Sequence, residues 1–248
     1  MLGISRRLCS TLKDQLLSVR SHYANMQIAL QQKIALEEKC ILVDEFDRPV
    51  GEATKKYCHE IAKDGSIPLH RAFSVFIFNK KGDLLVQRRA ASKLTFPGCY
   101  TNTCCSHPLA DIQGESEEKD ALGIRKAAQR RLGFELGIPS KEVLPENFNF
   151  ITRIHYQAAG DEILGEHEID YVLFLQVNKV TVDPNPDEVS EIRWVPRSTI
   201  NNFVKNIDAP LTPWFKLMLD HQLLVWWDNL DSIHKFQDHS TIHRFLKT

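Results

Sequence analysis

The sequence lacks the features that define several large classes of protein. No stretch approaches the roughly 20 apolar residues that a membrane-spanning helix needs, and the longest apolar runs, such as Leu223–Trp227, are short. The 31 lysines and arginines nearly balance 32 acidic residues, for a formal net charge of −1, so no overall positive field attracts nucleic acid or an anionic membrane. No P-loop, no GxGxxG that opens a helix after a strand and no GxSxG is present, which argues against those nucleotide-binding and hydrolase classes.

The amino-terminal residues do not carry the apolar core of a secretory leader, so we expect the six cysteines to be reduced thiols rather than a disulfide framework. Residues 1–22 carry basic residues against the single acid Asp14, with serines and apolar residues at helical spacing. This pattern is typical of a mitochondrial presequence. An unstructured or loosely helical extension that targets nothing is the alternative.

The composition, with 43% hydrophobic and 25% charged residues, is that of a globular protein. We expect residues 1–37 to form an extension that ends in a helix over 23–37, and residues 38–248 to form one α+β domain, with helices packed on a mixed or antiparallel sheet. Hydrophobic periodicity and turn residues predict strands over 40–43, 52–56, 72–78, 84–88, 149–156, 166–177 and 191–195, and helices over 117–136, 197–206 and 213–228.

The predicted strand over 166–177 opens with two carboxylates. Because side chains of a strand alternate between its faces, Glu166 and Glu168 project to one side and His167 to the other. Two acids on one face, with Asp170 next along, either coordinate a cation or force one carboxyl group to hold a proton. A solvated edge strand is the alternative.

Three histidines add nitrogen ligands to these carboxylates. His59, His70 and His107 are each, taken alone, more often hydrogen-bonded core or surface residues. Together with two carboxylates they form a mixed ligand set that suits zinc, manganese or iron, whereas magnesium prefers oxygen. A further group of His234, His239 and His243 near the carboxy terminus fits a frayed polar helix better than a metal site.

The polar loop 101–108 carries adjacent cysteines, Cys104 and Cys105, shortly before His107. A nearby cation or imidazolium lowers the pKa of a thiol from its usual value of about 8.5 and makes a proton-accepting thiolate. Two small buried hydrophobic residues are the alternative.

Cations and aromatic side chains accompany the predicted strands. Arginine offers a fork for phosphate oxygens and lysine a point charge, and aromatic faces attract a developing cation. Solvated surface charges and ordinary core aromatics are the alternatives. The cations are Lys55, Lys56, Arg71, Arg88, Arg89 and Lys93, and the aromatic residues are Tyr156, Trp214, Trp226 and Trp227.

Several of these segments together resemble type I isopentenyl-diphosphate isomerase of the animal kind. They are residues 70–76 (HRAFSVF), 96–98 (FPG), 101–108 (TNTCCSHP), 125–131 (RKAAQRR) with 135–138 (ELGI), and 165–171 (GEHEIDY). The similarity runs from about residue 40 to about residue 239, in order and with similar spacing.

The resemblance implies a Nudix-like fold, with one departure from the wider superfamily. The hydrolase box ends in REUxEExGU, where U is apolar, whereas residues 130–138 read RRLGFELGI. Arg131 and Phe134 stand where two acids belong, which leaves only Glu135. Because such acids hold metals against the bridging phosphate, their loss argues against hydrolysis.

The resemblance also implies roles for single residues. A divalent metal would be held by His59, His70, His107, Glu166 and Glu168, and Glu135 would help a magnesium ion bridge to the substrate diphosphate. The implied metal is Mg²⁺, with Mn²⁺ or Zn²⁺ as alternatives at the His/Glu site. The diphosphate would be bound by Lys55, Arg89, Lys93 and Ser106.

The implied reaction interconverts isopentenyl and dimethylallyl diphosphate in isoprenoid and sterol biosynthesis. Protonated Glu168, near Tyr156, would deliver a proton to the terminal methylene, and Cys105 would take a proton on the other face of the carbocation. Trp214 would stabilise that cation. Cys104 matches no catalytic position.

Two other functions stay open at this point: a Nudix pyrophosphohydrolase, and a protein that binds diphosphates without turnover. The expected partner is a small-molecule diphosphate, with no nucleic acid and no membrane span, and the expected state is a monomer or a weak dimer. The resemblance implies a cytoplasmic or peroxisomal location, while the amino terminus favours mitochondria. The last residues, Leu246 to Thr248, do not form an S-K-L type of peroxisomal signal.

Overall fold

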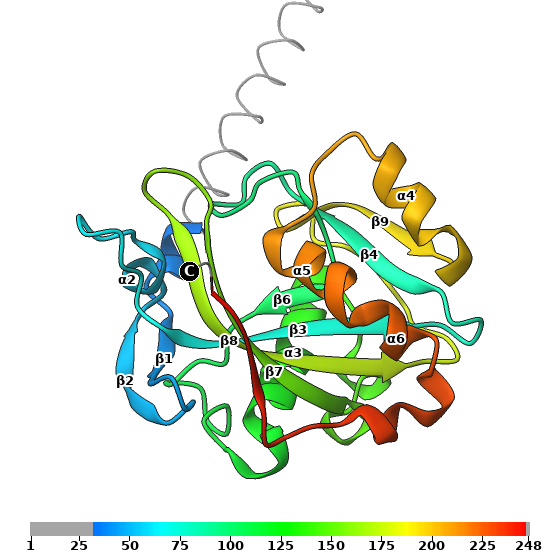
Figure 1. The fold of residues 1–248 in the computed structure, drawn as a ribbon, viewed down its shortest axis with the longest axis horizontal. Coiled ribbons are helices and arrows are strands. Elements are labelled where there is room, and N and C mark those ends of the chain that lie inside the picture. The colour runs from blue at the N-terminus through cyan, green and yellow to red at the C-terminus, as the bar shows by residue number, and fades with distance from the viewer. Residues whose placement is uncertain (1–31, 247–248) are drawn as a thin grey trace, which may run out of the picture.

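The computed structural model describes residues 32–246, and Figure 1 shows a mixed sheet with helices on both faces. Residues 32–36 are helical. The strands are β1 (Lys39–Val43), β2 (Pro49–Thr54), β3 (His70–Phe78), β4 (Leu84–Arg89), β5 (Tyr100–Thr101), β6 (Cys104–Ser106), β7 (Asn149–Ala159), β8 (Gly165–Gln176), β9 (Val189–Val195) and β10 (Ile242–Phe245). The helices are α2 (Lys55–His59), α3 (Leu122–Leu136), α4 (Ile200–Asn206), α5 (Pro213–His221) and α6 (Leu223–Trp227). Within the described range, no helix is both long and apolar enough to span a bilayer.

Strand β3 is the centre of the sheet. It runs parallel to β8 along its full length, and the sheet continues from β8 through the antiparallel strand β7 to β10, which is parallel to β7. On the other side β3 pairs with β1 and then β2, and it also pairs with β6 and β4, which carries β5 and β9. The sheet is therefore mixed, as the α+β expectation allowed.

The alternating side chains of β3 contribute to two separate hydrophobic layers. Phe73, Val75 and Ile77 pack in the layer that contains α3. Phe76 and Phe78 pack in the layer that contains α5 and α6, which Figure 1 shows across the sheet from α3. All nine residues of β3 are buried, as expected for a strand that is covered on both faces.

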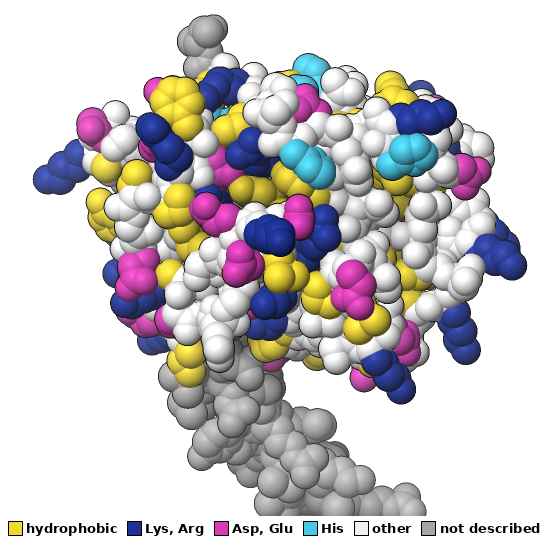
Figure 2. All heavy atoms as spheres, turned by 90° about the horizontal axis from the view of Figure 1, so that it is seen from below, with side chains coloured by type: hydrophobic (Ala, Val, Ile, Leu, Met, Phe, Trp, Pro, Cys, Tyr) yellow, Lys and Arg dark blue, Asp and Glu magenta, His cyan; other side chains and the backbone are white. Residues whose placement is uncertain are grey.

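The surface carries charges of both signs. Figure 2 views the molecule from below, and the basic and acidic side chains on that face are intermingled. This distribution agrees with the formal net charge of −1.

Several predicted boundaries change in the structure. The strand expected over 52–56 ends at Thr54, whose side chain caps α2 by accepting a hydrogen bond from the Tyr57 backbone N–H. The helix expected from 117 begins at Leu122, because Ala121 has a left-handed backbone with φ of 53°. Gln222 separates α5 from α6 within the expected helix 213–228. The short elements α2, β5, β6 and β10 were not predicted, and the expected extension lies mostly outside the described residues.

The turn between β1 and β2 is tied to the sheet by a buried acid. Asp47 is 5% exposed and accepts hydrogen bonds from Arg71 Nε at 2.7 Å, from Arg153 Nη1 at 2.9 Å and from the Tyr171 hydroxyl. These donors lie on β3, β7 and β8, so one carboxylate compensates two guanidinium groups and joins four segments of the chain.

Replacing Asp47 by Ala leaves these guanidinium groups without their shared carboxylate. We expect Asp47→Ala to lower the free energy of unfolding by about 3–5 kcal/mol, the usual cost of breaking a buried ion pair from one side. Urea denaturation measures the change. Asp208→Ala is the control, because the Asp208 side chain is 70% exposed and pairs with Arg88 at the surface, so its effect should lie near the experimental error. Equal effects of the two variants would contradict the assignment.

Candidate active site

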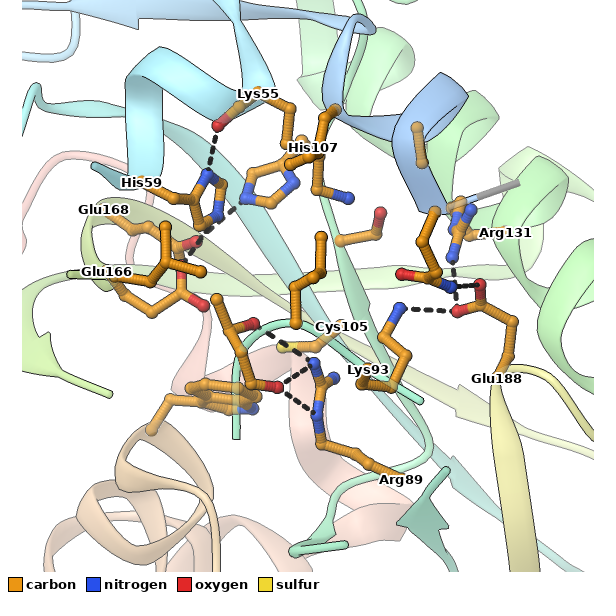
Figure 3. A pocket seen from close by; sticks show the side chains of 18 of the residues that line it. Lys55, His59, Arg89, Lys93, Cys105, His107, Arg131, Glu166, Glu168 and Glu188 are labelled. Carbon is orange, nitrogen blue, oxygen red and sulfur yellow. Dashed lines mark hydrogen bonds and ion pairs between the residues drawn. The ribbon is translucent and has the colours of Figure 1, made fainter. Parts of the chain in front are cut away.

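A single pocket gathers titratable side chains from both halves of the sheet. Figure 3 shows a group of histidines and acids on one side of this pocket, Cys105 near its middle, and Lys93, Arg131 and Glu188 on the other side. The helical residues 32–36 contribute Gln32, Ala35 and Leu36 to the wall, and aromatic rings of Tyr156 and Trp214 also line it.

Five buried residues form a candidate metal centre. They come from α2, from β3, from the residue that follows β6, and from β8, and their ligand atoms all lie within 4.8 Å of one another. The residues are His59, His70, His107, Glu166 and Glu168. Parallel pairing of β3 with β8 sets His70 opposite Glu168. The structure thus brings together all five residues that the resemblance named for the metal.

The imidazole rings are oriented by backbone carbonyl groups. His59 Nδ1 donates to Lys55 O at 2.7 Å and His70 Nδ1 donates to Pro68 O at 2.9 Å, which leaves Nε2 of both rings toward the acids. Nε2 of His70 is buried and has no hydrogen-bond partner. A buried ring nitrogen among carboxylates, on a ring fixed by an outer hydrogen bond, is what a metal ligand requires. The residues present therefore fit a divalent metal.

Charges within this cluster are strongly coupled. Burial opposes ionisation of both His70 and Glu168, but the interaction between the two side chains outweighs it. The Glu168 carboxylate raises the pKa of His70 to about 9, and His70 lowers the pKa of Glu168 to about 2. Burial lowers the pKa of His107 well below its usual value, which favours the neutral imidazole that binds metals.

The face of β8 follows the predicted alternation. Glu168 accepts hydrogen bonds from the Tyr156 hydroxyl at 2.6 Å and lies 2.9 Å from Nε2 of His107. His167 faces the other way, where its Nε2 lies 2.9 Å from Nε2 of His155. Burial raises the pKa of Tyr156 well above its usual value, so its hydroxyl is a stable donor.

The two adjacent cysteines of strand β6 face opposite sides of the sheet. Its pairing with β3 sets Cys104 opposite Val75 and Cys105 opposite Ser74. Cys104 is fully buried in the layer that contains α3, whereas Cys105 lines the pocket. Only the second thiol is placed to meet a ligand in that pocket.

The four residues assigned to diphosphate binding, Lys55, Arg89, Lys93 and Ser106, all line the pocket. Arg89 is held by hydrogen bonds to Thr95 O at 2.7 Å and Phe96 O at 3.1 Å, and its guanidinium lies 5.7 Å from the centre of the Trp214 ring. Lys93 Nζ lies 2.6 Å from Glu188. Burial lowers the pKa of Lys93 to about 8, although the Glu188 charge opposes this change.

Glu135 lies outside the five-residue cluster. Its buried carboxylate accepts hydrogen bonds from Arg131 at 2.7 Å and Gln87 at 3.1 Å, and Arg131 also pairs with Glu188 at 3.2 Å. The magnesium role of Glu135 therefore stays a prediction. Glu188 was missed from the sequence, since no spacing links it to Lys93 and only the fold brings them together.

The carboxy-terminal histidines do not gather. His234 is exposed, and His239 Nε2 donates to Phe150 O at 2.7 Å. Among residues 32–246 only the five-residue cluster described above groups metal-type ligands in this way.

Comparison with known proteins gives first a class and then a family. Residues 68–215 match the NUDIX domain family, which makes the fold that of a Nudix protein and confirms the expected fold class. The crystal structure of DR0079 from Deinococcus radiodurans aligns with a TM-score of 0.49 at 17% identity, covering 75% of this chain and 99% of that chain.

The sequence relatives are closer. Isopentenyl-diphosphate Delta-isomerase 1 of Mesocricetus auratus is 49% identical over 227 residues, which cover 90% of this chain and 97% of that protein. The Bos taurus protein of the same name is 50% identical over 212 residues, covering 84% and 92%, and the chloroplastic Arabidopsis thaliana isomerase I is 47% identical over 224 residues, covering 87% and 76%. The chain belongs to the type I isopentenyl-diphosphate isomerase family.

The cluster makes a direct prediction about metal binding. We expect the purified chain to bind a divalent metal, and His59→Ala to weaken that affinity at least about tenfold, the lower end of what loss of even a supporting group costs. Isothermal titration with Mn²⁺ after chelation measures both. His234→Ala, which removes an exposed imidazole outside the cluster, should bind like the unmodified chain, and a similar loss in both variants would place the metal elsewhere.

Proposed function

We propose that this chain interconverts isopentenyl and dimethylallyl diphosphate with Glu168 and Cys105 as its two proton-handling groups. Family membership gives the reaction. The observation that carries the assignment of residues is that a thiol from β6 and a carboxylate from β8 line one pocket, which also holds the cations that a diphosphate needs. Moving a double bond by one carbon requires a proton delivered at one end of the allyl unit and another removed at the other end.

Two proton transfers move the double bond. Glu168 is ionised in the free enzyme, because, despite burial, His70 lowers its pKa to about 2, and it must first take up a proton; it also accepts a hydrogen bond from Tyr156. It then gives that proton to the terminal methylene, and the alkene electrons form the new C–H bond and leave a tertiary carbocation. Cys105, as a thiolate, removes a proton from the adjacent methylene and becomes a thiol, and that C–H pair becomes the new double bond. Because an alkene is a weak base, the reaction needs a site that excludes water.

Aromatic rings in the pocket wall help to exclude water from the site. Trp214 is 3% exposed and donates its indole N–H to Asn102 at 3.0 Å, and Phe96 packs edge-to-face against it at 5.4 Å. The hydrogen bond fixes the indole in the wall of the pocket. Its π face is the group that we assign to stabilise the carbocation.

The diphosphate is assigned to Lys55, Arg89, Lys93 and Ser106. Their cationic and hydroxyl groups lie in the same pocket as the thiol, and arginine and lysine are the side chains that bind phosphate oxygens. Binding requires that Lys93 exchange its contact with Glu188 for one with a phosphate oxygen.

The metal would be held by His59, His70, His107, Glu166 and Glu168, and we propose Mg²⁺ in the cell, with Mn²⁺ or Zn²⁺ as alternatives for this nitrogen-containing set. When bound, a divalent ion supplies positive charge that polarises the Glu168 carboxyl group. A second role for Mg²⁺, with Glu135 beside the diphosphate, is also proposed.

We propose one catalytic domain over residues 38–248, which contains every residue assigned to the site and acts as a monomer or a weak dimer. A cytoplasmic or peroxisomal location is proposed, with mitochondria as the alternative. The presequence reading behind that alternative falls on residues that the structure does not describe.

An isomerase assay tests the assignment directly. With Mg²⁺ and isopentenyl diphosphate, we expect dimethylallyl diphosphate without free phosphate, and a loss of about 10²–10⁴-fold in turnover for Cys105→Ala and Glu168→Gln, the range that general acid and base groups contribute. Cys104→Ala is the matched control, because that thiol packs in the core. Phosphate release would favour a hydrolase, and full activity of Cys105→Ala would refute the choice of thiol.

Lys93 makes the reaction depend on pH. Its pKa of about 8 means that raising the pH through 8 removes a cation from the free enzyme, so kcat/KM should fall on the alkaline side. In Lys93→Arg the guanidinium stays charged, and the fall should move to higher pH. Profiles of kcat/KM between about pH 6 and 10 test this, with Lys80→Arg at an exposed position as the control. An unchanged alkaline limb in Lys93→Arg would contradict it.

A further inference from the structure

Behind the thiol of Cys105 lies a buried pair of polar side chains with no role in the proposed reaction. The antiparallel register of β3 and β6 sets Ser74 directly opposite Cys105. Ser74 Oγ lies 2.9 Å from Cys105 Sγ and donates a hydrogen bond to Asp170 Oδ2 at 2.7 Å. Ser74 therefore links Cys105, which lines the pocket, to Asp170 on β8.

Strand geometry explains why Ser74 and Asp170 meet. Ser74 alternates with Phe73 and Val75 and therefore shares the face of β3 that carries Phe76. Asp170 shares the face of β8 that carries Glu168, two residues earlier. Ser74 and Asp170 are both fully buried, so water cannot replace either partner.

The Ser74 hydroxyl can donate only one hydrogen bond at a time. A serine hydroxyl has one hydrogen and two lone pairs. In the thiol form of Cys105 that hydrogen goes to Asp170, and the S–H of Cys105 donates to the Ser74 oxygen. In the thiolate form, which accepts the proton from the substrate, the Ser74 hydroxyl can turn to donate to the sulfur. In both forms the contact holds Sγ at the pocket that Cys105 lines.

We propose that Ser74 and Asp170 are positioning residues for the Cys105 sulfur. This inference rests on the proposed role of Cys105 as proton acceptor. Without the serine oxygen, nothing polar on β3 selects among the staggered rotamers of the cysteine, and the sulfur spends less time aligned with the C–H bond that it must break. Asp170 acts on the sulfur indirectly, by holding the hydroxyl of Ser74 in place.

The main variant is Ser74→Ala in the full chain, which removes the hydroxyl and keeps the strand. We expect kcat to fall by up to about 100-fold, the cost of a misplaced reacting group, with KM within twofold because the diphosphate side chains are untouched. Iodoacetamide should alkylate Cys105 several-fold more slowly at fixed pH, followed by peptide mass mapping. Ser74→Thr, which restores a hydroxyl, should recover both quantities.

Two further variants separate positioning from general damage. Thr152→Val deletes another fully buried hydroxyl in the same sheet, one that has no hydrogen-bond partner, and should leave kcat and alkylation unchanged. Asp170→Asn keeps the side-chain volume and offers Ser74 an amide in place of the carboxylate, so it should lower kcat without changing KM, even if Ser74→Ala does not fold.

The outcomes are distinct. Wild-type kcat and alkylation rate in folded Ser74→Ala, or in Asp170→Asn, would overturn the positioning role of that residue. If the unmodified chain makes no dimethylallyl diphosphate, the proposed function fails, whereas slower alkylation of Cys105 in Ser74→Ala would still support the contact and an unchanged alkylation rate would overturn it.

Discussion

The site depends on the parallel pairing of β3 with β8. These strands lie far apart in the sequence, and their register sets His70 opposite Glu168 and brings Asp170 within reach of Ser74. Strand β6 then adds the thiol on the other side of β3. A central strand that is buried on both faces cannot slip by one residue without exchanging its two faces, so the apolar residues that face α3 and α5 also fix the positions of the polar ones.

A second constraint is that buried charges must be compensated. The pocket holds cations for an anionic ligand, and each of them needs a partner while the ligand is absent. Glu188 meets this need for Lys93 and Arg131, and Glu135 shares the guanidinium of Arg131. The acidic residues that a hydrolase uses for metals are thus replaced or neutralised in this chain, which agrees with a diphosphate that is bound and left intact.

Much of this arrangement could be predicted from the sequence, and the limits have physical reasons. Period-two alternation separated Glu166 and Glu168 from His167, because a strand has only two faces. The start of helix α2 at its N-cap, Thr54, was not predicted, because this cap depends on one hydrogen bond that residue propensities do not reveal. The strand β6 is three residues long and carries no periodic signal of its own.

Contacts between residues that are distant in the sequence could not be predicted either. Glu188 and Gln32 are ordinary polar residues in the sequence, and they meet at the pocket only after folding. Ser74 sits in a run of buried apolar residues and reads as part of a core strand. The resemblance named the groups that we propose touch a ligand, whereas the groups that support them emerged from the register of the sheet.

The adjacent cysteines on β6 show what this register means for the chemistry of the pocket. Neighbouring residues of a strand face opposite ways, so the pairing of β6 with β3 decides which thiol meets the pocket. A shift of that pairing by one residue would exchange Cys104 and Cys105 while leaving both cysteines in the chain. The alignment of two short strands is therefore as much a part of the site as the identity of its side chains.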